Sequence, residues 1–138
     1  MPESGPPRSE RDARPLIAPT ILFADDDQEL ANLHALFLRR RGYDVLLATD
    51  GEEALAKIVA APPTLVVADL RLPKLDGWRL CQRIKQDARL SRIPVILLSG
   101  LLDQESGRDE LADASLPKPC PPERLLEKIR ELLVPPAA

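Results

Sequence analysis

Short apolar runs of strand length alternate with helical patterns along most of this sequence, and this alternation limits the fold more than any other feature. The apolar runs occupy 20–24, 44–48, 64–68 and 94–98, and a very short one precedes Pro117. Helical patterns follow them at 28–42, 50–61, 78–88 and 121–133. Strict alternation of strand and helix favours a parallel sheet with helices on both faces, which is a three-layer, doubly wound α/β fold.

The length of the chain allows one domain. Its 138 residues are 44% apolar and 30% charged, which is ordinary for a soluble globular protein. Residues 1–18 are rich in proline, serine and alternating charge, so we expect a flexible tail there. We expect the folded domain at 19–134 and a short tail at 135–138.

Composition argues against several classes of partner. A net charge of −3 gives no support for a nucleic-acid-binding face, and the basic run at 39–41 suits the end of a helix, where the dipole favours cations. No apolar run approaches the roughly 20 residues of a membrane span, and the N-terminus lacks the apolar stretch of a signal peptide. Two cysteines without CxxC spacing suit a reduced compartment. We therefore expect a cytoplasmic protein that contacts neither nucleic acid nor membrane directly.

Polar and charged residues gather directly after the predicted strands. In a doubly wound sheet, the ligand site lies at the carboxyl ends of the strands, near the switch in strand order. The residues found there are three aspartates at 25–27, Asp69, Ser-Gly at 99–100 and Pro-Lys at 117–118. The second strand is placed at an edge. Carboxylates, one hydroxyl and one lysine should therefore converge.

These groups suit phosphoryl chemistry with a metal ion. Two or three carboxylates with a backbone carbonyl and waters suit Mg²⁺, which would also relieve the repulsion between crowded carboxylates. A lysine and a hydroxyl would bind the oxygens of a phosphoryl group. An aspartate in the middle of such a site could act as nucleophile and form an acyl phosphate.

Four segments together resemble one known family. "ILFADDD", "LVVADLRLPKLDG", "IPVILLSG" and "LPKP" follow one another in this order, each at the end of a predicted strand. In these motifs the sequence resembles the receiver domain of bacterial response regulators in two-component signalling, over about residues 20–133. The resemblance implies a flavodoxin-like five-stranded sheet in the order 2-1-3-4-5 and a phosphoprotein that takes part in signal transduction or a phosphorelay.

The resemblance assigns a role to each residue of the metal site. It implies that Asp69 is the phosphorylated aspartate and also a Mg²⁺ ligand. Asp26 would bind the ion directly and Asp25 mainly through water, while the backbone carbonyl of Arg71 would complete the protein ligands. Asp27 fits the N-cap or first turn of the following helix better than the metal site.

The resemblance also implies how the phosphoryl group is held. Ser99 would hydrogen-bond the group once it has formed, and Gly100 would keep the pocket open. Lys118 would pair with the phosphoryl charge, and its bond to Pro119 would be cis, as is usual in this family.

Two features depart from the family pattern. Receivers commonly carry an aromatic residue three positions before the lysine, and that position is Ser115 here. The stretch between Ser99 and Lys118 is also about one helical turn shorter than usual, and "DQESGRDE" within it is polar throughout. We therefore expect a fourth helix that is short or disordered, and an altered readout.

Several other residues suit structural roles. Leu30, Leu33 and Phe37 have helical spacing and are expected to face the core from the first helix. His34 lies one position from this stripe, so we expect it at the surface or at the boundary. Cys120 is expected to be a partly exposed loop thiol.

The function that these residues favour is a stand-alone response-regulator receiver. It would accept a phosphoryl group on Asp69 from a histidine kinase or phosphotransfer protein and signal through altered contacts with an unknown downstream protein. It would catalyse its own phosphorylation and dephosphorylation but turn over no external substrate, so it is not an enzyme in the usual sense.

Three alternatives stay open. A pseudo-receiver would keep the fold as a binding module without being phosphorylated. A Mg²⁺-dependent phosphohydrolase with an aspartate nucleophile would use an acidic cluster, Ser99 and Lys118 in a similar order. Such enzymes need further metal-binding aspartates after the lysine, however, and no aspartate follows Lys118. The chain could also be a receiver excised from a hybrid kinase.

Overall fold

The computed structural model describes residues 18–100 and 111–133. Within them, five parallel strands form one sheet in the order β2-β1-β3-β4-β5, which confirms the predicted order with β2 at an edge. The strands are β1 (Thr20–Ala24), β2 (Asp44–Ala48), β3 (Leu65–Asp69), β4 (Val95–Ser99) and β5 (Ala114–Pro117). β3 and β4 each end one residue later than predicted, so Asp69 and Ser99 belong to the strands themselves.

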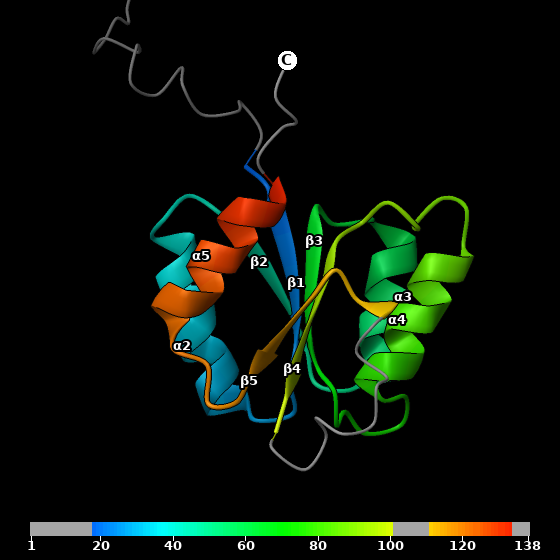
Figure 1. The fold of residues 1–138 in the computed structure, drawn as a ribbon, viewed down its shortest axis with the longest axis horizontal. Coiled ribbons are helices and arrows are strands. Elements are labelled where there is room, and N and C mark those ends of the chain that lie inside the picture. Colours follow the sequence, from blue (N-terminus) through cyan, green and yellow to red (C-terminus); the bar gives the residue numbers. More distant parts are fainter. Residues whose placement is uncertain (1–17, 101–110, 134–138) are drawn as a thin grey trace, which may run out of the picture.

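Helices cover both faces of the sheet (Figure 1). One face carries α2 (Gln28–Arg39) and α5 (Pro122–Leu133), and the other carries α3 (Gly51–Ala60) and α4 (Gly77–Gln86). Two apolar clusters result, one on each side, because successive side chains of a strand point to opposite faces. The short or disordered helix predicted between β4 and β5 falls largely on 101–110, outside the described residues, as do almost all of both predicted tails.

Three of the helices begin at an aspartate. The side chains of Asp27, Asp50 and Asp76 are the N-caps of α2, α3 and α4. Each accepts a hydrogen bond from the backbone N–H three residues later, at 3.2, 2.7 and 2.7 Å. This satisfies one of the N–H groups that a helix leaves without an intrahelical partner. The interpretation of Asp27 as a cap is confirmed.

The buried face of α2 differs from the predicted one. The helix buries two alanines, His34 and Leu38, whereas Leu33 is 61% exposed. Leu30 and Phe37 are only partly buried. The small alanine side chains let the helix approach the sheet closely, so the buried stripe is the one that carries them and not the one with the larger leucines. The prediction that Leu33 faces the core was wrong.

His34 and Cys120 are also more buried than predicted. The imidazole of His34 is 2% exposed, stacks on Phe23 with ring centroids 5.1 Å apart, and has its Nε2 atom 3.0 Å from the carbonyl oxygen of Cys120. Its Nδ1 atom lies 3.0 Å from the carbonyl oxygen of Leu30. A buried histidine is tolerated here because the ring nitrogen that carries the hydrogen can donate to one of these two carbonyl oxygens. Cys120 is buried as well, and burial raises the pKa of its thiol.

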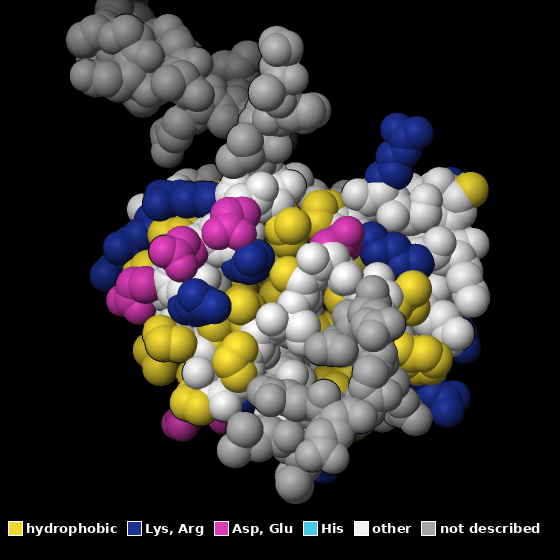
Figure 2. Space-filling model, in the orientation of Figure 1, with side chains coloured by type: hydrophobic (Ala, Val, Ile, Leu, Met, Phe, Trp, Pro, Cys, Tyr) yellow, Lys and Arg dark blue, Asp and Glu magenta, His cyan; other side chains and the backbone are white. Residues whose placement is uncertain are grey.

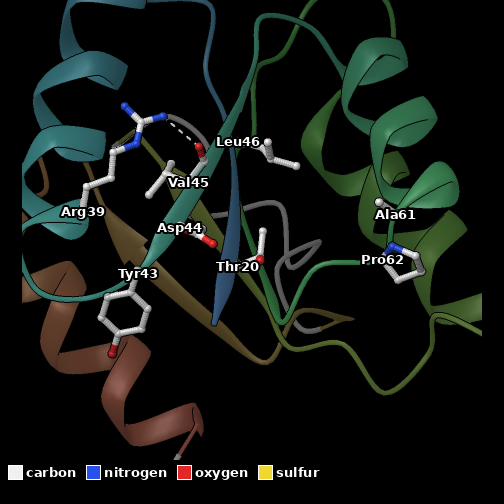
Figure 3. Close-up of a pocket in the computed structure, with 8 residues that line it drawn as sticks. All are labelled: Thr20, Arg39, Tyr43, Asp44, Val45, Leu46, Ala61 and Pro62. Carbon is white, nitrogen blue, oxygen red and sulfur yellow. Dashed lines mark hydrogen bonds between the residues drawn. The ribbon is translucent and has the colours of Figure 1, made fainter. Parts of the chain in front are cut away.

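Side chains from two helices cover the outer edge of β2. Arg39 of α2 donates to the carbonyl of Val45 at 2.8 Å (Figure 3), and Lys57 of α3 donates to the carbonyl of Leu47 at 2.7 Å. Charged side chains that hydrogen-bond to the backbone of an edge strand discourage its pairing with a strand of another chain. A surface hollow of about 630 Å³ lies at the start of β2 and is lined by Thr20, Arg39, Tyr43, Asp44, Val45, Leu46, Ala61 and Pro62.

Glu53 adds a polar contact just beyond the end of β2. Its carboxylate accepts hydrogen bonds from the backbone N–H and the hydroxyl of Thr49, at 2.8 and 2.9 Å, and pairs with Lys57 at 3.0 Å. The backbone hydrogen bond from Thr49 is the main reason that the pKa of Glu53 is lowered to about 2.

The surface over α5 mixes charges of both signs (Figure 2). Arg124 pairs with Glu127 at 3.8 Å and Lys128 with Glu131 at 2.7 Å, each three residues apart on the helix. Among the described residues, none of the helices has the length and apolar character that crossing a membrane requires.

Candidate functional site

Asp69 lies at the carboxyl end of the central strand. β3 is paired on both sides, with β1 and β4, and Asp69 is its last residue. The carboxylate is only 4% exposed, and its Oδ1 atom accepts a hydrogen bond from the backbone N–H of Arg71 at 3.0 Å. The local turn therefore fixes the side chain, and the strand fixes the turn.

Lys118 follows directly after β5 and reaches Asp69. Its backbone N–H donates to the carbonyl of Ser99 at 2.8 Å, and its Nζ atom donates to Oδ2 of Asp69 at 2.6 Å. Burial lowers the pKa of the ammonium group, but the hydrogen bond to Asp69 and the neighbouring carboxylates outweigh burial, so the pKa is raised. The bond between Lys118 and Pro119 is cis, as the family resemblance implied.

The acidic pair comes from the end of β1. Asp25 is 1% exposed, and its Oδ1 atom accepts a hydrogen bond from the backbone N–H of Asp27 at 2.9 Å. Its Oδ2 atom is buried and has no hydrogen-bond partner in the part of the chain that the structure describes. Burial is the main reason that the pKa of Asp25 is raised, and the charge of Asp69 raises it further. Asp26, next to it, is exposed.

Asp25, Asp26 and Asp69 converge on one point. Each offers a carboxylate oxygen, and these oxygens lie within 4.8 Å of one another. Hard divalent cations such as Mg²⁺ prefer oxygen ligands of this kind. The partnerless Oδ2 atom of Asp25 fits such a site, because a buried carboxylate oxygen without a hydrogen bond is costly unless a cation compensates it.

Ser99 and Arg71 flank this cluster. Ser99 is the last residue of β4, next to β3, and is buried. Arg71 is exposed in the loop after Asp69. The structure thus brings Asp25, Asp26, Asp69 and Lys118 together and places the other two residues beside them. The roles of the Ser99 hydroxyl and of the Arg71 carbonyl stay predictions.

Sequence reasoning missed one group of contacts near the site. The backbone N–H of Gly51, at the start of α3, donates to the carbonyl of Pro73 at 3.1 Å, in the loop that carries Arg71. The Asp-Gly pair at 50–51 was assigned only to a helix start. Its glycine was the available signal, because glycine often marks a close approach of two backbones.

A match to a protein-family model shows which family has this arrangement of residues. The model described as "Response regulator receiver domain" matches residues 21–130. The chain belongs to the response regulator receiver domain family. Receiver domains are signalling modules of two-component systems that histidine kinases phosphorylate, and they bind Mg²⁺ at an acidic pocket. The cluster of Asp25, Asp26 and Asp69 could hold such an ion.

Curated relatives of this receiver include whole regulators. It is 42% identical over 118 residues to the "DNA-binding dual master transcriptional regulator RpaA" of Synechocystis, covering 83% of this chain and 49% of RpaA. It is 36% identical over 113 residues to "Protein PilG" of Pseudomonas aeruginosa, covering 80% of this chain and 84% of PilG. The chain therefore spans about half the length of regulators such as RpaA.

Solved receiver structures share the fold. A putative response regulator from Chloroflexus aurantiacus has a TM-score of 0.79 and 32% identity, covering 85% of this chain and 98% of that one. The chemotaxis response regulator CheY4 of Vibrio cholerae has a TM-score of 0.78 and 25% identity, covering 85% of this chain and all of that one.

Proposed function

We propose that this receiver accepts a phosphoryl group on Asp69 from a phosphohistidine of a histidine kinase or phosphotransfer protein, in a Mg²⁺-dependent reaction. The observation that carries the proposal is the setting of Asp69, buried at the end of the central strand, 2.6 Å from Lys118 and grouped with Asp25 and Asp26. In receivers, such a carboxylate is the acceptor.

The step follows from the chemistry of the two groups. A carboxylate oxygen of Asp69 attacks phosphorus and forms a P–O bond while the P–N bond of phosphohistidine breaks, and the imidazole leaves with the electron pair. A bound Mg²⁺, held by Asp25, Asp26, Asp69 and the Arg71 carbonyl, would offset negative charge on the transferring group. Lys118 holds a positive charge at Asp69 from the start.

The product is an acyl phosphate that changes the charge and hydrogen bonding of the pocket. Lys118 would move its hydrogen bond to a phosphoryl oxygen, and the hydroxyl of Ser99 would donate a second one. We propose that these changes alter contacts with a downstream protein, in the cytoplasm and without direct binding of nucleic acid by this domain. Phosphorylation with a small donor and later loss of phosphate would be catalysed by the receiver itself.

Mass spectrometry with acetyl phosphate and Mg²⁺ tests the proposal. We expect one phosphoryl adduct on the unsubstituted protein and none on Asp69→Asn. The control is Asp76→Asn, because Asp76 caps α4 and otherwise pairs only loosely with the exposed Arg79 at 3.8 Å, and asparagine caps as well as aspartate does. An adduct that persists in Asp69→Asn would contradict the assignment of the acceptor. An adduct that depends on Asp25 but not on Asp69 would favour the phosphohydrolase alternative.

A second candidate function is a pseudo-receiver that binds partners without phosphorylation. The observation that favours it is Ser115, where receivers commonly have an aromatic residue; it lies in β5 opposite Leu97 of β4. Beryllofluoride, which mimics the phosphoryl group, separates the two. Shifts of backbone amide signals around Ser99 and Ser115 support the phosphorylated receiver, and their absence together with no adduct supports the pseudo-receiver.

The single-domain organisation expected from the sequence also stays a proposal. The match to this chain covers only 49% of RpaA but 84% of PilG, so RpaA is about twice as long as the matched region and PilG is only slightly longer. An immunoblot of the natural host tests it. A band near 15.2 kDa is expected for a single-domain receiver, and a much larger band would contradict it.

A further inference from the structure

The loop between β3 and α4 carries the Arg71 carbonyl and is closed at its base. The backbone N–H of Gly77 donates to the carbonyl of Leu70 at 2.8 Å, and the N–H of Arg71 binds the side chain of Asp69. Leu72, one residue further, is buried in the apolar cluster under α3 and α4. The loop is therefore anchored at its start and end, and its middle depends on other contacts.

The middle of this loop is a strained turn. The backbone N–H of Leu75 donates to the carbonyl of Pro73 at 2.7 Å, and Lys74 between them has a φ of 70°. A hydrogen bond across three residues with a positive φ at the centre marks the rare form of the γ-turn. A residue with a Cβ atom adopts this conformation only where its surroundings hold it there. The ammonium group of Lys74 lies 3.6 Å from Asp50.

The contact that holds the turn comes from the first residue of α3. Gly51 donates its backbone N–H, which has no intrahelical partner at this position, to the carbonyl of Pro73 at 3.1 Å. Its Cα atom lies so close to the loop that an added Cβ would be 1.7 Å from the carbonyl oxygen of Leu75 and 2.6 Å from its carbonyl carbon. Any other side chain at this position would push the loop away from α3.

We infer that Gly51 and Lys74 are positioning residues for the metal site, and that they act by keeping the Arg71 carbonyl in place. This inference rests on the proposed function, in which that carbonyl is a Mg²⁺ ligand. Asp25, Asp26 and the backbone of Asp69 sit at or beside strand ends, so displacement of the loop acts on the Arg71 carbonyl and on the Arg71 N–H that holds the Asp69 side chain. The expected effect is therefore weaker binding of Mg²⁺ with the three carboxylates intact.

Magnesium affinity of Gly51→Ala, measured by calorimetry, is the direct test. The backbone amide signal of Arg71 serves as a second readout, because this N–H is bonded to Asp69. We expect the Kd to rise about 10-fold, which is the lower end of the usual effect of losing support for a metal ligand. Ala56→Gly is the matched control, since it weakens the same helix at an exposed residue outside the apolar cluster that contains Leu70 and Leu72 of the loop.

Lys74→Gly keeps the test decisive if Gly51→Ala does not fold. Glycine adopts a positive φ readily, so this variant should melt at a higher temperature. The variant should nevertheless bind Mg²⁺ a few-fold more weakly, because a more flexible turn holds the Arg71 carbonyl less firmly in place. Unchanged Mg²⁺ affinity in the variants that fold would overturn the inference and leave the proposed function standing. No Mg²⁺ response and no phosphoryl adduct in the unsubstituted protein would instead count against the proposed function.

Discussion

Replacement of Asp25 by asparagine should stabilise the metal-free protein. Two unit charges 4.8 Å apart, the upper limit between the clustered oxygens, repel by about 3.5 kcal/mol at an effective dielectric of about 20. Attraction to Lys118 offsets part of this repulsion. A buried acceptor without a hydrogen bond adds a cost of about 1–3 kcal/mol. An amide is uncharged and its N–H groups can donate to the neighbouring carboxylates.

We therefore expect Asp25→Asn to raise the free energy of unfolding in the absence of metal by about 1–3 kcal/mol. This range counts only the cost of the buried acceptor without a hydrogen bond and leaves out the charge repulsion. For a domain of this size, that corresponds to about 3–6 °C in melting temperature per kcal/mol. In excess Mg²⁺ the unsubstituted protein should instead be more stable than Asp25→Asn. The unsubstituted protein gains about 2.7 kcal/mol at 100 times its Kd, and the variant gains much less because it has lost a carboxylate ligand.

Urea unfolding in EDTA and in excess Mg²⁺ measures both effects. Asp27→Asn is the matched control, because it makes the same change in charge two residues away at an exposed N-cap, where asparagine serves equally well. Its stability should stay within about 0.5 kcal/mol of the unsubstituted protein. The reasoning is refuted if Asp25→Asn is less stable than the unsubstituted protein in EDTA, or if Asp27→Asn stabilises the fold as much.

Three further predictions concern stability and association. Glu53→Gln should cost at most about 1 kcal/mol at neutral pH, because Glu53 is partly exposed. Since the folded pKa of Glu53 is about 2 against an ordinary 4.5, its contribution is present above pH 4.5, and the difference between the proteins should vanish as the pH falls toward 2 in urea titrations. Arg39→Met with Lys57→Met uncovers the edge of β2, so light scattering should show faster aggregation than in either single variant. Leu38→Ala should cost about 2–5 kcal/mol because Leu38 is fully buried, while Leu36→Ala, at a residue 48% exposed on the same helix, should cost less than about 0.5 kcal/mol; equal costs in chemical denaturation would contradict the observed orientation of α2.

The sheet and the site could be predicted because both depend on local patterns. Strands buried on both faces read as continuous apolar runs, and a doubly wound sheet brings their carboxyl ends together whatever the details of packing. Asp69 and Lys118, 49 residues apart, could thus be placed together before any distance was known, and they are 2.6 Å apart. The capping role of Asp27 followed in the same way from the residues next to it.

The orientation of α2 could not be predicted, because two stripes of the helix compete. The stripe with Leu33 is more hydrophobic, but the stripe with His34 has small neighbours that permit close packing. Hydrophobicity favours the first stripe. The second is buried because the carbonyl groups that face the imidazole, one of them from Cys120, 86 residues away, make burial of a polar ring tolerable. A contact at such a separation in sequence leaves no local pattern.

The long-range contacts that sequence reasoning missed bear on the same part of the site. The carboxylates sit at or beside the ends of β1 and β3, whereas the Arg71 carbonyl and Lys118 belong to segments that follow strands. Each of these segments is held from outside, one by Gly51 of α3 and the other by His34 of α2 through Cys120. A change on the outer surface of α2 or α3 can therefore reach the site through these segments, and from α2 also through Asp27, whose backbone N–H donates to Asp25. Such a change should alter the binding of Mg²⁺ or the pairing of Lys118 with Asp69, while the strand backbone that carries Asp69 stays in place.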